Sequence, residues 1–436
     1  MKYIATFYTF FWIIYYPTCI AFYNDTEGGF AYIDELMTLA LIVFTFMNTK
    51  NKSTNKAPWK EYWAFLVILF AYLGYSFVMR VNTPTAAMRD MVQWIRPFSV
   101  IYCTWILNPR FIKWQKRLML TTMVITLAFW LLTNRTSLEK EGAEFVVLGQ
   151  LAMCTGMAWY ILTKPTYFNL YMAVALMATG MFAPKFKYLG EVAIFVYMML
   201  FMHKKINFKS PRTVWIFSLL AVVMLYITWF KFEAYYVSGF QEGAERMARP
   251  ESFKTAFGKI IWDYFPFGPG MGTFGVAAAA KIYSPLYYKY NLSDIWGLSP
   301  DDPMFLADAF YPTLAQFGVV GICLFIIYWK RRLVAMNKII DMRYYRVAWI
   351  TFFCLAIEQM ADTSFLSGKG MGYCMLIGLC LNANRNMLDS QRQWKKYLYK
   401  KEKLTEANIR LSKQENGLKA SSRKYLEKLA EERKDV

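Results

Sequence analysis

Two arginines seven residues apart, Arg89 and Arg96 in RDMVQWIRP, have the types and the spacing that could bind an anion. Residues seven positions apart lie on one face of an α-helix, so both guanidinium groups would point in one direction. Guanidinium groups bind phosphate oxygens through paired hydrogen bonds, which predicts a substrate-binding role for these arginines. The alternative is that they reach lipid headgroups or form ion pairs, with Asp34, Glu35 and Asp90 as candidate partners.

Two carboxylates, Glu358 and Asp362 in IEQMADTSF, lie four residues apart and therefore on one helix face. Their neighbours are largely apolar, and an ionisable side chain in an apolar segment usually serves a function because its burial is costly. The pair could bind the arginines, hold a polar ligand or line a transport path. A transport path is the weakest of these alternatives, because the sequence shows no internal repeat.

The elements that must position these side chains are long and apolar. Hydrophobic residues make up 57% of the 436 residues, aromatic residues 19% and charged residues only 18%. This composition argues against a water-soluble enzyme and indicates a chain that lies in lipid. About twelve segments approach the roughly 20 apolar residues that a membrane-spanning helix needs, so we expect an all-α, polytopic membrane protein. The segments are 3–22, 29–48, 61–79, 88–107, 118–134, 145–163, 167–184, 189–202, 214–235, 311–329, 347–365 and 371–384.

The distribution of positive charge predicts which connections face the cytoplasm. The formal net charge is +20, and 35 of the 50 Lys and Arg residues fall on alternate connections and in the two terminal segments. The positive-inside rule assigns these connections and both termini to the cytoplasm. The basic excess therefore reports topology, and nucleic acid is not expected as a partner. The first apolar segment lacks a small-residue cleavage site and is expected to remain as a span.

Two segments depart from the pattern of helices and short connections. Segment 236–310 is the only long connection on the outer face, and its aromatic residues predict a packed cap rather than disorder. Segment 385–436 is charged and free of proline, so a solvated surface helix, a weak coiled coil or a frayed tail all fit. We therefore expect four parts: nine helices in 1–235, the outer loop domain, three helices in 311–384 and a cytoplasmic helical tail.

The outer loop carries a specific pattern of residues. In ERMARPESFKTAFGKIIWDYFPFGPGMGTFG, Arg249 is followed seventeen residues later by Pro266 and then by a glycine-rich turn that ends at Phe274. Further on, DAFYPTLAQFGVVG runs from Asp308 into the next apolar segment. Together with RDMVQWIRPF in an early segment, this pattern resembles the large periplasmic loop of the O-antigen ligase and polymerase superfamily. The resemblance covers the loop and agrees with the membrane layout around it.

The resemblance implies a GT-C-like glycosyltransferase in the bacterial inner membrane. Members of this superfamily take glycans linked to undecaprenyl diphosphate at the periplasmic face and transfer the reducing-end sugar to an acceptor hydroxyl. The donor and the acceptor oligosaccharides, membrane lipid and a chain-length regulator protein are the partners that it implies. No nucleotide sugar, metal or other cofactor is expected.

The same resemblance suggests roles for the basic residues of the outer face. Arg249 matches the loop arginine of the superfamily and is expected to stabilise the charge that develops on the departing diphosphate. Arg246 lies one turn earlier and could take its place. Lys185 and Lys187, in FAPKFKYLGE, match a basic position at a helix start and are expected to bind substrate. The alternative for this lysine pair is that it anchors to lipid headgroups.

The ligase branch of the superfamily has a periplasmic histidine that is thought to deprotonate the acceptor, and this chain departs from that pattern. Its single histidine, His203, lies in the basic segment MHKKINFK, which we expect inside the cell. A base on the outer side would then have to be a carboxylate, and Asp308 is nearest to the position of the missing histidine. The alternative for Asp308 is a cap on the following helix. We therefore predict a polysaccharide polymerase. The first alternative is an O-antigen or protein-glycan ligase of the same superfamily, and a transporter of lipid-linked glycans is a weaker one.

The glycine-rich turn FGPGMGTFG permits two interpretations. Gly270 and Gly272 could present backbone amides to a phosphate or a sugar, because glycine allows close approach of the backbone. The run could equally be a tight turn between two loop helices. The nearby tyrosines of KIYSPLYYKY likewise could stack on sugar rings or form an aromatic belt at the membrane interface.

Overall fold

The computed structural model describes residues 2–21, 32–51, 54–133, 144–183, 186–207, 209–233, 237 and 246–432. Helices account for 77% of the structure and the described residues contain no strand, so the predicted all-α class is confirmed. The chain divides into two compact units, 1–382 and 383–436. The second unit consists of α17 (Ala383–Glu432), one continuous helix of 50 residues where we predicted a charged tail.

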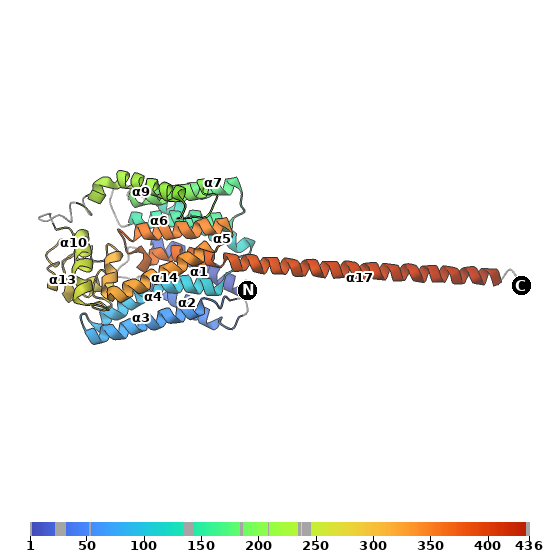
Figure 1. Cartoon of the computed structure of the whole chain (residues 1–436), viewed down its shortest axis with the longest axis horizontal. Helices are drawn as coiled ribbons and strands as arrows, with labels where there is room; N and C mark the ends of the chain where they lie inside the picture. The colour runs from blue at the N-terminus through green and yellow to red at the C-terminus, as the bar shows by residue number, and fades with distance from the viewer. Residues whose placement is uncertain are drawn as a thin grey trace. The chain divides into compact units, whose positions relative to one another are not determined.

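The first unit is a bundle in which each of the twelve predicted apolar segments overlaps a helix (Figure 1). The bounds follow the apolar runs because a helix satisfies its own backbone hydrogen bonds along such a run. The long elements are α1 (Lys2–Ala21), α2 (Ile33–Met47), α3 (Trp59–Met79), α4 (Pro84–Leu107), α5 (Lys113–Thr133), α6 (Glu144–Leu162), α7 (Tyr167–Ala178), α8 (Phe186–Val196) with η4 (Tyr197–Phe201), α9 (Pro211–Phe232), η8 (Tyr311–Phe317) with α14 (Gly318–Asn337), α15 (Met342–Glu358) and α16 (Met371–Leu381).

Local signals fix the ends of the helices that carry the candidate residues. Thr83 caps the start of α4 by accepting a hydrogen bond from the Ala86 amide, and Pro84 occupies the first helical position. At the other end of α4, Asn108 takes a left-handed conformation that stops the helix. Asp341 caps α15 in the same way as Thr83, with the Arg343 amide as donor. These caps set the positions of the arginines on α4 and of the carboxylates at the end of α15.

Connections that we predicted on the inner side contact other segments of that side. The Asn55 amide donates to the Ile106 carbonyl oxygen at 2.6 Å, and the Ile206 amide donates to the Tyr345 hydroxyl at 2.9 Å. The Lys205 ammonium group donates to the Asn337 carbonyl oxygen at 3.0 Å. Segments far apart in the sequence that the charge pattern assigns to one side are therefore neighbours in two pairs.

The described part of the long loop, 246–310, packs at the opposite end of the bundle from the N-terminus (Figure 1). It contains α10 (Ala248–Thr255), η7 (Ala256–Ile260), α11 (Ile261–Asp263), α12 (Ala277–Lys281) and α13 (Pro285–Lys289). Its core is aromatic: Tyr287 is fully buried and stacks on Phe274 with ring centroids 5.1 Å apart. Tyr287 therefore neither stacks on a sugar nor lies in an aromatic belt, which were the two predicted alternatives, because it is buried inside the loop domain.

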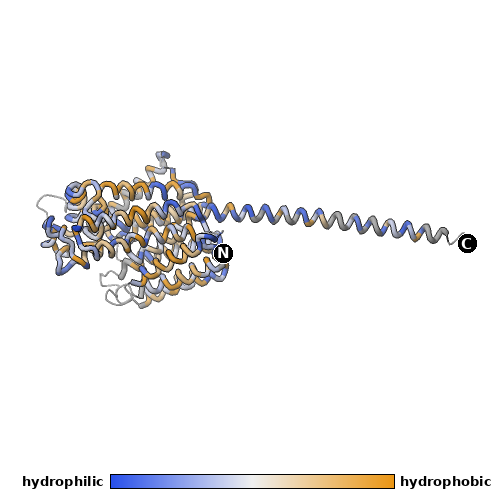
Figure 2. Tube along the Cα trace, turned by 90° about the horizontal axis from the view of Figure 1, so that it is seen from below, coloured by the Kyte–Doolittle hydropathy of each residue, from blue (hydrophilic) through white to orange (hydrophobic). Residues whose placement is uncertain are grey.

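Two described helices are long and apolar enough to cross a membrane by length and composition: α3 and the continuous stretch Tyr311–Asn337. This finding does not test the other ten of the twelve predicted spans, and the number of twelve therefore stays a prediction. The bundle nevertheless exposes many large apolar side chains, and Figure 2 shows hydrophobic residues along its helices. On α3 alone the exposed ones include Trp63, Val67, Phe70 and Val78.

Candidate functional site

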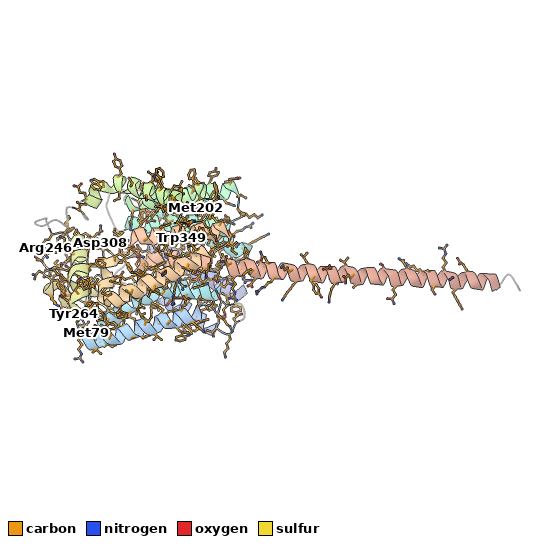
Figure 3. All side chains as sticks on the ribbon, in the orientation of Figure 1. Met79, Met202, Arg246, Tyr264, Asp308 and Trp349 are labelled. Carbon is orange, nitrogen blue, oxygen red and sulfur yellow. The ribbon has the colours of Figure 1, made fainter. Side chains whose placement is uncertain are left out.

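Arg249 and Asp308 form a direct ion pair. Arg249 lies in the first turn of α10, and both its Nε (2.8 Å) and its Nη2 (2.5 Å) donate to Oδ2 of Asp308. Their side chains are 16% and 23% exposed, so the pair is partly dry but can be reached from outside. Figure 3 labels Asp308 and the loop residue Arg246 at the end of the bundle where the loop packs. The two residues predicted to be catalytic therefore meet.

The segment that carries Asp308 is fixed against the end of α15. The Phe310 amide donates to the Gln359 carbonyl oxygen at 3.1 Å, and the Thr363 hydroxyl donates to the Ala307 carbonyl oxygen at 3.1 Å. The Tyr311 hydroxyl donates to a carbonyl oxygen within α15 at 3.2 Å. Asp308 does not cap the next helix, because η8 follows Phe310 and has no side-chain cap. The capping alternative is therefore wrong.

A second cluster of charges lies where the start of α8 meets the end of α15. The Lys187 ammonium group is 2.6 Å from Oε2 of Glu358 and 3.4 Å from Oδ2 of Asp362. Asp362 also binds Lys369, at 2.7 Å, from the segment before α16. The two carboxylates thus pair with lysines rather than with the outer arginines, and Lys187 is occupied by acids rather than by lipid headgroups. We call these four residues the lysine–carboxylate cluster.

Neutral polar side chains hold Glu358 in place. Oε2 of Glu358 accepts hydrogen bonds from Gln150 (2.9 Å) and from the Ser364 hydroxyl (2.9 Å). Gln150 also donates to the Ser364 oxygen at 2.6 Å. The Glu358 side chain is 0% exposed, so its position is determined by these neighbours and by Lys187. A cluster that is fully packed in this way can hold a lysine in one orientation.

The ion pair and the lysine–carboxylate cluster act on each other electrostatically. Burial raises the pKa of Asp308 above its ordinary value, and the charge and hydrogen bonds of Arg249 oppose that rise. The Asp362 carboxylate raises the pKa of Asp308 further, while Lys187 lowers it. Asp308 therefore belongs to one neighbourhood of alternating charge that includes Arg249, Lys187 and Lys369.

Arg96 has a different environment from the one we expected. Its Nη1 lies 2.8 Å from Oδ2 of Asp34, its Nη2 pairs with Glu35, and its Nη1 donates to the Leu366 carbonyl oxygen at 2.9 Å. The side chain is buried, whereas Arg89 is exposed in the first turns of α4. The prediction that both arginines converge on one ligand is wrong, because the first turn of α2 supplies two acids to Arg96 alone. Arg96 instead ties α4 to the segment that carries Lys369.

Arg246 braces the loop. Its Nη1 donates to Asp294 at 2.9 Å, its Nη2 donates to the Asn291 carbonyl oxygen, and its Nε lies 3.9 Å from Glu251. None of these partners belongs to the Arg249–Asp308 pair. Arg246 therefore does not share the partner of Arg249, although it lies one turn away.

The backbone amides of the glycine-rich turn already have partners inside the protein. The Gly270 amide donates to the Gln316 carbonyl oxygen at 3.0 Å, and the Gly272 amide donates to Asp90 (2.9 Å) and to the Gln316 side chain (3.0 Å). The φ angles of Gly270 and Gly272 are 99° and 74°, and a Cβ at Gly272 would lie 2.6 Å from the carbonyl carbon of Ala86. The amide-presenting interpretation is therefore wrong: the turn docks the loop on α3 and α4.

Two predicted features need separate comment. Lys185 lies outside the described residues. Lys369 was missed, although a signal existed: it is a lysine in a connection that the alternation of sides assigns to the outer face, where the positive-inside rule makes basic residues unusual. Its contact with Asp362 joins it to the site.

Comparisons with known proteins leave the resemblance as an expectation. No protein-family model matches the chain, and no curated protein matches it. The function is therefore argued from the site and the bundle around it.

Proposed function

We propose that the protein is a polysaccharide polymerase of the bacterial inner membrane, of O-antigen or capsule type, with about twelve spans. Its substrate would be a glycan linked to undecaprenyl diphosphate, joined to an acceptor sugar hydroxyl at the periplasmic face. The exposed apolar side chains of the bundle support a lipid environment, because a soluble protein rarely exposes so much apolar surface. The contacts between segments that the charge pattern assigns to one side support the predicted sidedness.

One observation carries the proposal: Nε and Nη2 of Arg249 both donate to Oδ2 of Asp308, at 2.8 and 2.5 Å. The sequence predicts complementary tasks in one reaction for these two residues. The transfer needs a cation for the departing diphosphate and a base for the attacking hydroxyl, and both must lie within one substrate's reach. A contact between residues 59 positions apart meets that requirement. Their partial exposure leaves the pair accessible to a substrate from the outer side.

The chemistry follows from those two groups. The acceptor hydroxyl oxygen attacks the anomeric carbon of the donor's reducing-end sugar, and the bond from that carbon to the diphosphate oxygen breaks. The electron pair of the broken bond leaves with the lipid diphosphate, whose added negative charge Arg249 stabilises. The hydroxyl proton moves to the Asp308 carboxylate, which acts as the general base. The lysine–carboxylate cluster is balanced in charge, because Lys187 and Lys369 pair with Glu358 and Asp362, and it acts on Asp308 electrostatically.

The position of the only histidine supports a polymerase over a ligase. His203 lies two residues before Lys205, which contacts Asn337 at the last residue of α14. Asp308 precedes the other end of this helix, about 30 Å away for its 20 residues. An imidazole therefore cannot act beside Arg249, and the base must be a carboxylate.

Purified protein supplied with a defined lipid-linked repeat unit tests the proposal. A polymerase converts the repeat into a ladder of longer lipid-linked glycans without any other acceptor, which gel electrophoresis resolves. A ligase leaves the repeat unextended and transfers it only when the final acceptor is added. In cells, loss of a polymerase leaves surface glycan with a single repeat, and loss of a ligase leaves the final acceptor bare. The second outcome in either assay refutes the polymerase.

A further inference from the structure

A groove of about 370 Å³ runs between α3, α4 and α14. It is lined almost entirely by apolar and aromatic side chains, including Phe65, Ile68, Phe98, Leu324, Phe325 and Ile327. Among the described residues, the charged ones that line it are Glu61, Arg331 and Arg332, from the start of α3 and the second half of α14. The groove is therefore amphipathic along its length, with charge at one end and hydrocarbon along the rest.

Arg332 is the most unusual group in this groove. Its side chain is 1% exposed, its Nη2 pairs with Glu61, and its guanidinium carbon lies 4.7 Å from the centre of the Trp105 ring. Two further aromatic rings, of Tyr102 and Tyr328, flank the group. Its Nε and Nη1 are buried and have no hydrogen-bond partner among the described residues. Buried donors without partners are rare in native proteins, so an anionic acceptor is expected at this position.

Along α3, the groove is about as long as one leaflet of a bilayer is deep. From Glu61 to Tyr72, both of which line it, α3 rises by eleven residues, or about 16 Å. One half of a hydrocarbon core about 30 Å thick is about 15 Å deep. A chain of one leaflet could therefore lie along α3 while its headgroup stays at the charged end.

The leaflet follows from the same charge pattern that orients the bundle. Arg332 lies five residues before the end of α14, and the basic segment 330–346 follows the rule for cytoplasmic connections. Arg331 is exposed beside it at the charged end. Two adjacent arginines against one glutamate leave an excess of positive charge, which an anionic headgroup complements and a zwitterionic one complements less well.

We propose that this groove binds an anionic phospholipid of the cytoplasmic leaflet. One acyl chain lies between α3 and α14, and the headgroup phosphate accepts hydrogen bonds from Arg332 and is attracted by Arg331. The inference rests on the membrane placement in the proposed function but not on the glycosyl transfer. The charged end of the groove lies away from Arg249 and Asp308, near the end of α14 that the charge pattern assigns to the cytoplasm.

Variants of α3 separate the groove from its surroundings. Ala64 is exposed and lines the groove, so Ala64→Trp fills the space without removing a packed side chain. Val67 is an exposed residue one turn away on α3 that does not line the groove, and Val67→Trp is the matched control. At the charged end, Arg331→Gln removes an exposed charge. Arg332→Lys keeps the charge that pairs with Glu61 but removes the guanidinium donors.

Native mass spectrometry of the delipidated, detergent-solubilised protein measures the binding, with phosphatidylglycerol, phosphatidylcholine or a polyprenyl phosphate added. We expect one phosphatidylglycerol to be retained about tenfold better than phosphatidylcholine. Ala64→Trp, Arg331→Gln and Arg332→Lys should each weaken its retention, and Val67→Trp should not. Equal retention of the two phospholipids, preference for the polyprenyl phosphate, or normal retention by Ala64→Trp overturns the inference. Glycosyl transfer by the same samples is scored separately, so a failure of the proposed reaction remains distinguishable.

Discussion

Arg249 and Asp308 lie 59 residues apart in the chain, and two nitrogens of the arginine donate to a single oxygen of the aspartate. α10 supplies the arginine, and a segment fixed to the end of α15 supplies the aspartate. Both residues therefore come from the described part of the loop, 246–310, and the bundle holds the segment of the aspartate in place through the end of α15. Asp308 can hold the guanidinium group of Arg249 in place and also restrict the direction from which a substrate approaches it.

Arg249→Lys should lose activity although it keeps the positive charge. A point ammonium group cannot form the paired hydrogen bonds of a guanidinium group with phosphate oxygens. Removing one preorganised donor from a developing charge typically lowers turnover by roughly 10²-fold or more. The measurement is the rate of glycan extension from a defined lipid-linked repeat unit, with thermal unfolding to check that the variant is folded.

Arg246→Lys is the matched control, because Arg246 lies on the same loop and binds Asp294 and Glu251 instead. It should keep most of the activity. Exchanging the pair, with Arg249→Asp and Asp308→Arg together, tests a purely structural role: the ion pair is restored, but the groups stand in each other's positions. If the exchanged protein or the Arg249→Lys variant is fully active, Arg249 does not stabilise the leaving group.

The sequence predicts the helices well, because each long apolar run must form its own backbone hydrogen bonds. The twelve runs all overlap helices, and the aromatic content of the outer loop correctly indicated a packed structure. Among the described residues, α3 and the Tyr311–Asn337 stretch qualify as spans by length and composition, so the number of twelve stays a prediction. Helices such as α4 carry charged residues that lower their apolar character. Of these, Asp90 and Arg96 are buried with hydrogen-bond partners inside the bundle, whereas Arg89 is exposed.

The partners of the charged side chains were harder to predict than the helices. Arg96 had three candidate acids in the sequence, and the structure gives it the two on α2. Lys187 pairs with Glu358 across 171 residues, a choice that depends on which helices pack together. Residue type and spacing identify a group that needs a partner, whereas the partner is set by long-range packing. Lys369 is different, because its partner Asp362 lies seven residues away in the chain and its place in an outer connection already marks it as unusual.

Lys187→Met should destabilise the protein strongly. The substitution keeps most of the stem but leaves the fully buried Glu358 without its closest positive charge, and breaking a buried pair typically costs about 3–5 kcal/mol. Thermal unfolding in detergent measures the change. The double variant Lys187→Met, Glu358→Gln should recover much of the loss, because a neutral amide needs no counter-charge. Lys254→Met, which affects a partly exposed pair with Glu251, should change stability by about 1 kcal/mol or less.

Gly272→Ala should loosen the docking of the loop on the bundle. Its φ of 74° is unfavourable for alanine, and the added Cβ would lie 2.6 Å from the carbonyl carbon of Ala86, a backbone atom that cannot turn aside. We expect the free energy that holds the loop in its docked position to fall by roughly 1–3 kcal/mol. Limited proteolysis of the loop should then be faster, which is the measurement. Gly258→Ala is the control, because a Cβ there would meet no atom within 4 Å. Equal protection of both variants would show that the turn does not require glycine.

Asp308→Asn should reduce turnover by at least about 10²-fold, the lower end of what a general base contributes. The amide keeps the size of the side chain and can still accept a hydrogen bond from Arg249, so the segment before η8 should stay folded. Asp302→Asn is a control from the same loop segment. Normal turnover by Asp308→Asn would mean that the reaction proceeds by leaving-group stabilisation without this base.

The pH dependence of turnover distinguishes a base from a partner that only orients Arg249. A general base works when it is deprotonated, so activity should fall as the pH falls through the pKa of Asp308. Burial raises that pKa above the usual value near 3.9, so the acid side of the profile should lie at a higher pH than an exposed aspartate would give. Arg249 opposes the rise, and Arg249→Ala should therefore move this fall in its residual activity to a still higher pH. In Asp308→Asn the fall should disappear from the residual activity, measured between about pH 4 and pH 8 with thermal unfolding followed at each pH. An unchanged profile in Asp308→Asn would assign the titration to another group and leave Asp308 only the task of positioning the arginine.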